Sequence, residues 1–278
     1  MSQKRYPNKQ QGEKMLELYQ FEMSHYAEKV RLILDYKGLA YRKIEVTPGI
    51  GQLELYKMSG QRQVPVLKDG QEIVADSTAI AKYLDRKYPE RPIIPVNPEQ
   101  RGLCLLIEEW ADESIGLKAR KALFGGLSQS QTFRTSVLPS TTPDFVKLLV
   151  GAVPGDFLNL LGSGIGFGPD VVKSAQEDLK QDLEALSLIL LDRPYLVADY
   201  PTLADFAVAG LSMYIKFPEG PYLEIPENLK GKGVPGLADS AAYETFFNWR
   251  DRLYAQYRKQ PTPTTTTNPK APTSIEID

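Results

Sequence analysis

Ser24 and His25 are the adjacent pair of side chains best suited to chemistry, and they stand where one repeat gives way to another. Residues Leu16–Phe21 alternate as in a strand, whereas apolar residues in Ala27–Leu34 recur at helical spacing. Serine at such a switch is a good helix N-cap. The pair therefore allows three interpretations: a helix cap, a nucleophile with its base, or a hydroxyl that donates to a ligand's sulfur.

The rest of the chain lacks the residues that a serine hydrolase or a structural zinc site would need. His25 is the only histidine, so a Ser-His-Asp triad would have to use it, and there is no G-x-S-x-G segment to supply a better serine. Cys104 is the only cysteine, which rules out a disulfide within the chain. One cysteine and one histidine also cannot form the usual ligand shell of structural zinc, so we expect no metal site.

The length of the chain favours two globular domains, and its charge bears on the partners it could bind. The chain has 278 residues, of which 42% are hydrophobic, enough for more than one core. Its 33 Lys and Arg residues against 35 Asp and Glu residues give a formal charge of −2, so we expect no nucleic-acid partner. Without a signal-peptide pattern or an apolar run of about 20 residues, we expect a cytoplasmic protein with no transmembrane segment.

The elements that must position Ser24 alternate between strand and helix in the first third of the chain. Gly38 is placed to end the first helix, and Asp69-Gly70 is a hairpin turn between two strands. The expected order is strand, helix, strand, helix, strand, strand, helix. After the first strand and helix these elements are the strand Tyr41–Val46, a short helix Gln52–Met58, the strands VPVLK and QEIVA, and the helix Ser77–Tyr88.

From about Asn97 the pattern becomes helical. Two apolar stripes are predicted, and an aromatic helix is expected over Tyr243–Tyr257. We expect residues 1–14 to be flexible and the low-complexity residues 259–278 to be disordered. Residues 124–170 mix loop residues with apolar patches, and GSGIGFG within them lacks the strand and lysine of a phosphate loop. The stripes are Leu103, Leu106, Ile107 and Trp110, then Leu179, Leu183, Leu186 and Leu190.

Four short motifs in this order resemble the glutathione S-transferase family: Ser24-x-x-Ala27, Val64-Pro65, Asp76-Ser77 and Thr202-Leu203-Ala204-Asp205. The resemblance covers roughly residues 15–258. It implies an α/β thioredoxin-like N-terminal domain over 15–92, followed by an all-α helical-bundle domain over 97–258. Thr202 and Asp205 have a structural role as a capping box.

In that family the thiol of glutathione, the co-substrate, is activated by a residue at the start of the first helix or, in other classes, by a tyrosine at the end of the first strand. The resemblance gives this role to Ser24, whose hydroxyl would donate to the thiolate beside the positive end of a helix. Relatives with cysteine at this position run disulfide exchange, so thiol transfer is disfavoured, and Cys104 is expected to be a buried hydrophobe. Tyr19 is the second choice for the activating hydroxyl, and His25 is expected to be a solvated residue of the first turn.

The same resemblance assigns the residues that would bind the rest of glutathione. Val64 and Pro65 would present a backbone edge to the cysteinyl unit, with a cis peptide bond turning the chain outward. Ser77 would hold the γ-glutamyl carboxylate at a helix N-terminus and Asp76 the ammonium group. Gln52 and Gln63 would contact the glycyl end.

The implied reaction is conjugation of glutathione to a hydrophobic electrophile by a homodimer. The electrophile would lie between the domains, near residues 108–124 and 206–217, with residues 124–170 as a lid, a dimer contact or a membrane contact. Two alternatives stay open. One is a non-catalytic binding or scaffold protein of the same fold, and the other is a glutathione-dependent peroxidase or isomerase.

Overall fold

A four-stranded sheet forms the N-terminal part of the chain in the computed structural model. The strands are β1 (Leu16–Gln20), β2 (Tyr41–Glu45), β3 (Val66–Asp69) and β4 (Glu72–Ala75), in the order β2-β1-β3-β4. β1 runs parallel to β2 and antiparallel to β3, and β3 and β4 form a hairpin. The structure describes residues 15–47, 50–129 and 168–260, together with the single residues 131, 135 and 152.

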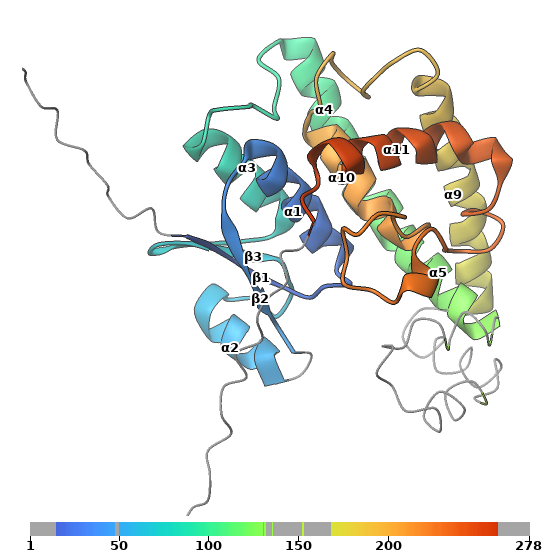
Figure 1. Cartoon of the computed structure of the whole chain (residues 1–278), viewed down its shortest axis with the longest axis horizontal. Coiled ribbons are helices and arrows are strands. Elements are labelled where there is room, and N and C mark those ends of the chain that lie inside the picture. The colour runs from blue at the N-terminus through green and yellow to red at the C-terminus, as the bar shows by residue number, and fades with distance from the viewer. Residues whose placement is uncertain are drawn as a thin grey trace, which may run out of the picture.

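Three helices accompany the sheet: α1 (His25–Lys37), α2 (Ile50–Ser59) and α3 (Ser77–Lys87). α1 and α3 lie on the side of the sheet that faces the helical region, and α2 lies away from it (Figure 1). α1 ends at Gly38, which has φ 73° and therefore adopts a left-handed conformation that glycine accommodates at no steric cost. The predicted element order and the thioredoxin-like fold class are confirmed.

The remaining helices form the predicted all-helical region. They are α4 (Pro98–Trp110), a π-helix (Ala111–Gly116), α5 (Leu117–Gln129), α9 (Pro169–Ile189), α10 (Leu203–Leu211) and α11 (Glu244–Tyr257), with short 3-10 turns between α10 and α11. The π-helix joins α4 to α5 without a break in the chain direction. π-Helical turns inside helices are rare and occur frequently at functional sites.

One predicted apolar stripe is half wrong, because only Ile107 and Trp110 of its four residues pack against the core, and the other is correct. Leu103 is 44% exposed and Leu106 67% exposed, while Cys104 and Glu108 on the same helix are buried. The inward face of α4 includes a charged residue, because Glu108 meets a buried lysine of α1, and a hydrophobicity pattern cannot show this pairing. The stripe on α9, from Leu179 to Leu190, is buried as predicted.

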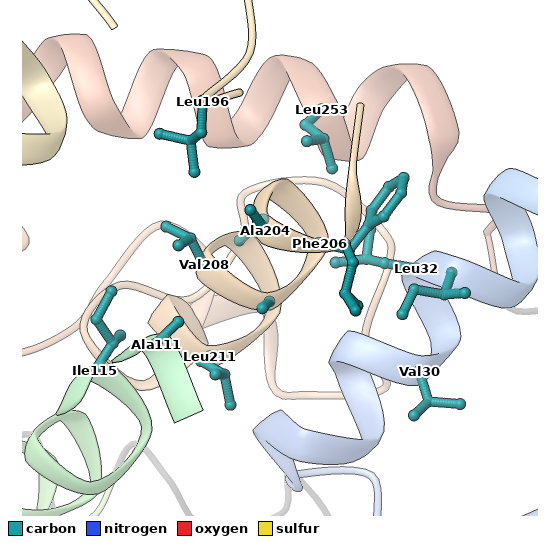
Figure 2. Packing of buried hydrophobic residues seen from close by; sticks show 14 of the residues in the cluster. Val30, Leu32, Ala111, Ile115, Leu196, Ala204, Phe206, Val208, Leu211 and Leu253 are labelled. Carbon is teal, nitrogen blue, oxygen red and sulfur yellow. The ribbon is translucent and has the colours of Figure 1, made fainter. Parts of the chain in front are cut away.

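α10 is the centre of the core. Every residue of this helix is buried, and Figure 2 shows α10 between α1, the π-helix and α11. A capping box starts it: Asp205 accepts from the backbone N–H and hydroxyl of Thr202 and from the backbone N–H of Leu196. The predicted structural role of Thr202 and Asp205 is confirmed.

Arg258 ties the end of the described chain to the first helix. It is almost completely buried, and its guanidinium binds Glu28 at 2.9 Å and Asp35 at 2.7 Å, both on α1. These carboxylates are themselves buried, so the arginine supplies the countercharge that burial of a carboxylate requires.

Several expectations fall on residues outside the described ranges. The flexible segment 1–14, most of the tail 259–278 and most of segment 124–170, including GSGIGFG up to residue 167, lie there. The domain boundaries 15–92 and 97–258 stay a prediction. No helix among the described residues combines the length and the apolar character needed to cross a bilayer.

Candidate functional site

A cavity of about 490 Å³ lies between the sheet domain and the helical region. Its walls come from the end of β1, the first turn of α1, the chain before β3, the start of α3 and the π-helix with α5. All seven predicted site residues line it, namely Ser24, Gln52, Gln63, Val64, Pro65, Asp76 and Ser77. Residues that are distant in sequence are thus brought to one cavity, as the resemblance implied.

Ser24 is the N-cap of α1 and lies at the cavity wall, 9% exposed. Its Oγ accepts a hydrogen bond of 3.2 Å from the backbone N–H of Ala27. A hydroxyl has one proton and two lone pairs, so the cap uses acceptor capacity and leaves the O–H available. Among the described residues the Ser24 hydroxyl has no acceptor, so it can donate to an anion placed at the positive end of the helix.

Val64 and Pro65 form the rim of the cavity just before β3, joined by a cis peptide bond. Within the part of the chain that the structure describes, neither backbone group of Val64 has a hydrogen-bond partner. An extended peptide in the cavity would find there one donor and one acceptor. Gln63 adjoins this pair, and Gln52 reaches the cavity from α2.

Asp76 and Ser77 start α3 and line the cavity beside Val64 and Pro65, since Val66 pairs with Ala75 across the β3–β4 hairpin. Asp76 caps the helix through its Oδ1, which accepts from the backbone N–H of Ala79 at 2.9 Å. Its φ of 79° lies in the left-handed region that residues with a side chain rarely adopt. Such conformations are concentrated at binding and active sites. Ser77 is the first helical residue, is 2% exposed and lines the cavity.

The other candidate activating groups are less well placed. Tyr19 donates its hydroxyl to Glu17 and is not among the lining residues. Tyr26 lines the cavity, but it donates to the backbone carbonyl of Asp112, and burial raises its pKa to about 12. Cys104 is a buried residue of α4, is not among the lining residues, and burial raises the pKa of its thiol. Among these groups, Ser24 has the geometry to donate to a ligand sulfur.

His25 is buried, contrary to the prediction of a solvated first-turn residue. It is 3% exposed, because the π-helix and Tyr214 cover the start of α1. Its Nε2 lies 3.1 Å from the backbone oxygen of Gly116, so Nε2–H donates and Nδ1 is unprotonated. Burial lowers the pKa of His25 to about 3, since a charged imidazole would lose its hydration.

We expect His25 to stay neutral in the folded protein down to about pH 4. In the unfolded chain its pKa lies near 6.5, so the unfolded state binds more protons between about pH 3 and 6.5. Stability contributed by this group is therefore full above pH 6.5 and falls as the pH is lowered, by up to about 1.4 kcal/mol per pH unit. Because the chain has a single histidine, its imidazole nitrogen resonances can be followed by NMR without assignment. Titration near pH 6.5 in the native state would contradict the burial.

Part of the cavity wall comes from charged residues that the sequence did not single out. Asp112 and Glu113 belong to the π-helix, and Arg120 to the first turns of α5. Burial raises the pKa of Asp112. The sequence placed the second substrate near residues 108–124 only through the resemblance. The π-helix, which sets the direction in which these side chains point, has no sequence signature that we could use.

The comparisons with known proteins agree with this architecture. Residues 18–92 match the family model of the glutathione S-transferase N-terminal domain. Glutathione S-transferase Z1 of Arabidopsis thaliana is 39% identical over 95 residues, which are 33% of this chain and 43% of that protein. The matched part thus spans about two fifths of that relative. The sequence similarity lies in the N-terminal domain.

Solved structures extend the likeness to the helical region. The beta-etherase LigF from Sphingobium sp. strain SYK-6 has a TM-score of 0.58 at 20% identity and covers 87% of this chain and 100% of its own. A glutathione S-transferase-I bound with lactoylglutathione also has a TM-score of 0.58 at 20% identity, covering 87% of this chain and 94% of its own. At this identity the likeness concerns the fold alone. The chain is thus similar to glutathione S-transferases in sequence over residues 18–92 and in fold over most of its length.

Proposed function

We propose that the chain binds glutathione in the cavity, holds its sulfur as a thiolate with the hydroxyl of Ser24, and transfers it to an electrophilic carbon. The observation that carries this proposal is the hydrogen bonding of the Ser24 hydroxyl. Its oxygen is committed to capping α1, while its proton points to no acceptor in the described residues. A donor at the N-terminus of a helix can stabilise the anionic sulfur of bound glutathione.

The energy of this contact matches the task. A cysteine thiol has a pKa near 8.5, so it is mostly protonated at neutral pH, whereas the thiolate is the nucleophile. A hydrogen bond to a charged group contributes about 1.5–3 kcal/mol, and one pKa unit corresponds to about 1.4 kcal/mol. Ser24 would therefore lower the thiol pKa by about 1–2 units, and thiolate becomes a major species.

The other contacts follow from the cavity. The backbone N–H and C=O of Val64 would pair with the cysteinyl unit, Ser77 would bind the γ-glutamyl carboxylate, and Asp76 would bind the ammonium group. Gln52 and Gln63 would lie toward the glycyl end. In the reaction the sulfur lone pair forms the new S–C bond, and the leaving group departs with the electrons of the bond that breaks.

The electrophile would lie against the helical side of the cavity. Leu117 and Tyr214 offer apolar contact there, and Phe21 adds apolar surface from the end of β1, which suits an electrophile with a hydrophobic body. We propose that the protein acts as a homodimer, as family members with two such domains do. Leu106 on α4 and Ile73 on β4 are exposed apolar residues available for a contact between copies. Sedimentation equilibrium should then give twice the chain mass of 31.1 kDa.

The test is the ultraviolet difference spectrum of glutathione bound to the protein, followed against pH. Thiolate absorbance should appear about 1–2 pH units below that of free glutathione. A conjugation assay with a chloronitrobenzene then measures turnover. Retention on immobilised glutathione without turnover would favour a non-catalytic binding protein. Failure to retain glutathione at all would overturn the proposed function.

A further inference from the structure

Lys29 is a buried cation placed directly behind the cavity wall. Its side chain on α1 has no exposed surface, yet its ammonium group is surrounded by oxygens from three elements. The partners of Nζ are Glu108 Oε1 at 2.6 Å, Asp112 Oδ1 at 2.8 Å and Oδ2 at 2.9 Å, Thr78 Oγ1 at 3.1 Å and Ser77 Oγ at 3.4 Å. The ammonium thus joins α1 and the start of α3 to α4 and the π-helix.

The contact with Ser77 determines what that hydroxyl can do. An ammonium group donates only, so the side of Ser77 Oγ that faces Lys29 acts as an acceptor. The positive charge at 3.4 Å also repels the hydroxyl proton and directs it away from Lys29. Because Ser77 lines the cavity at the N-terminus of α3, the direction left for its O–H includes the cavity.

Thr78 completes the arrangement without competing for Ser77. Its hydroxyl donates to Glu108 or Asp112 and accepts from Lys29, so its proton and its oxygen are both used inside the protein. The two carboxylates exceed the one ammonium by one negative charge. Lys29 therefore partly shields an anion bound at Ser77 from Glu108 and Asp112, which would otherwise repel it.

We propose that Lys29 is a positioning residue for the γ-glutamyl carboxylate of glutathione, acting through Ser77. It keeps the Ser77 hydroxyl a donor toward the cavity and holds α3 against the π-helix whose Asp112 lines the same cavity. This inference rests on the proposed function. It goes beyond a structural ion pair, because it predicts an effect confined to one end of one ligand.

The test compares Lys29→Met with Lys37→Met. Lys37 is a second buried lysine of α1, at the far end of the helix, where it binds the backbone oxygen of Tyr88 and the carboxylate of Asp85. The Kd of glutathione should rise about tenfold in Lys29→Met and less than twofold in Lys37→Met. Both variants lose a buried ion pair. Their unfolding temperatures therefore measure how much stability this loss costs, separately from any effect on glutathione binding.

A second ligand separates positioning from general damage. Cysteinylglycine lacks the γ-glutamyl residue, so its Kd, measured by competition, should change less than twofold in Lys29→Met. Lys29→Met added to Ser77→Ala should weaken glutathione no further than Ser77→Ala alone, because the two residues act at one point. Equal weakening of both ligands, additive effects of the two substitutions, or a glutathione Kd unchanged from wild type would each overturn the inference.

If Lys29→Met does not fold, the double variant Lys29→Met with Glu108→Gln replaces it in the test. It removes one positive and one negative charge, so the net charge of the cluster is unchanged, and the same ligand comparison applies. If wild-type protein fails to bind glutathione, the proposed function is wrong. If wild type binds and the Lys29 variants bind equally well, only the role of Lys29 is wrong.

Discussion

Replacing Ser24 with alanine is expected to lower kcat/KM for glutathione conjugation by about 10- to 100-fold, from loss of about 1.5–3 kcal/mol of thiolate stabilisation. The physical reason is that Ser24 is the described cavity group with an uncommitted hydroxyl proton at the start of α1. The pKa of the bound thiol should rise by about 1–2 units, toward that of free glutathione. The ultraviolet difference spectrum measures this directly, and steady-state kinetics give the rate.

Because Ser24→Ala also removes the cap of α1, stability must be separated from chemistry. Ser24→Asp keeps an oxygen that can accept from the backbone N–H of Ala27. It has no proton to donate and places a negative charge beside the sulfur. We expect it to unfold near the wild-type temperature yet to be at least as inactive as Ser24→Ala, whereas Ser24→Thr should retain most activity. A fully active Ser24→Asp would exclude the hydroxyl as the activating group.

Replacing Asp205 with alanine is expected to lower the free energy of unfolding by about 3–5 kcal/mol, because it leaves buried backbone N–H groups without partners. The carboxylate is fully buried and accepts from the backbone N–H groups of Leu196 and Thr202 and from the Thr202 hydroxyl. Burial raises the pKa of Asp205 to about 6 even though these donors lower it. Denaturant unfolding at pH 7 measures the change as a shift of midpoint.

Asp205→Asn and Asp239→Ala provide the comparison for that loss. Asparagine keeps one acceptor oxygen and replaces the other with a donor that faces Thr202, so we expect an intermediate cost. Asp239 accepts from the backbone N–H of Gly236 in an exposed turn, where water can replace it, and its removal should cost less than about 1 kcal/mol. If Asp205→Ala costs no more than Asp239→Ala, the capping box is not a main support of the core.

Local features carried most of what the sequence predicted. The cap at Ser24, the stop at Gly38, the turn at Asp69 and the box from Thr202 to Asp205 each depend on a few neighbouring residues, and the structure contains all four. The seven site residues also needed only their motifs and the order of the elements. That they meet at one cavity follows from the fold that the resemblance implied.

Long-range pairing accounts for what the sequence missed. His25 was expected in solvent because nothing near it in sequence shows that Gly116 and Tyr214 cover it. Likewise, Lys29 resembles an ordinary charged residue on a helix surface until Glu108 is placed against it. An analysis of hydrophobic periodicity assigns charged residues to the solvent. It therefore cannot detect a buried polar interface between two domains.

The contact of Arg258 with α1 bears on whether the two halves of the molecule are modular. An isolated fragment ending near residue 92 would lose Arg258, which pairs with Asp35 and shares Glu28 with Arg31, and it would keep Lys29 without Glu108. In such a fragment, charged groups that are buried and paired in the whole protein would become exposed or lose their partners. The halves, distinct in architecture, should therefore melt together as one cooperative unit rather than behave as autonomous parts.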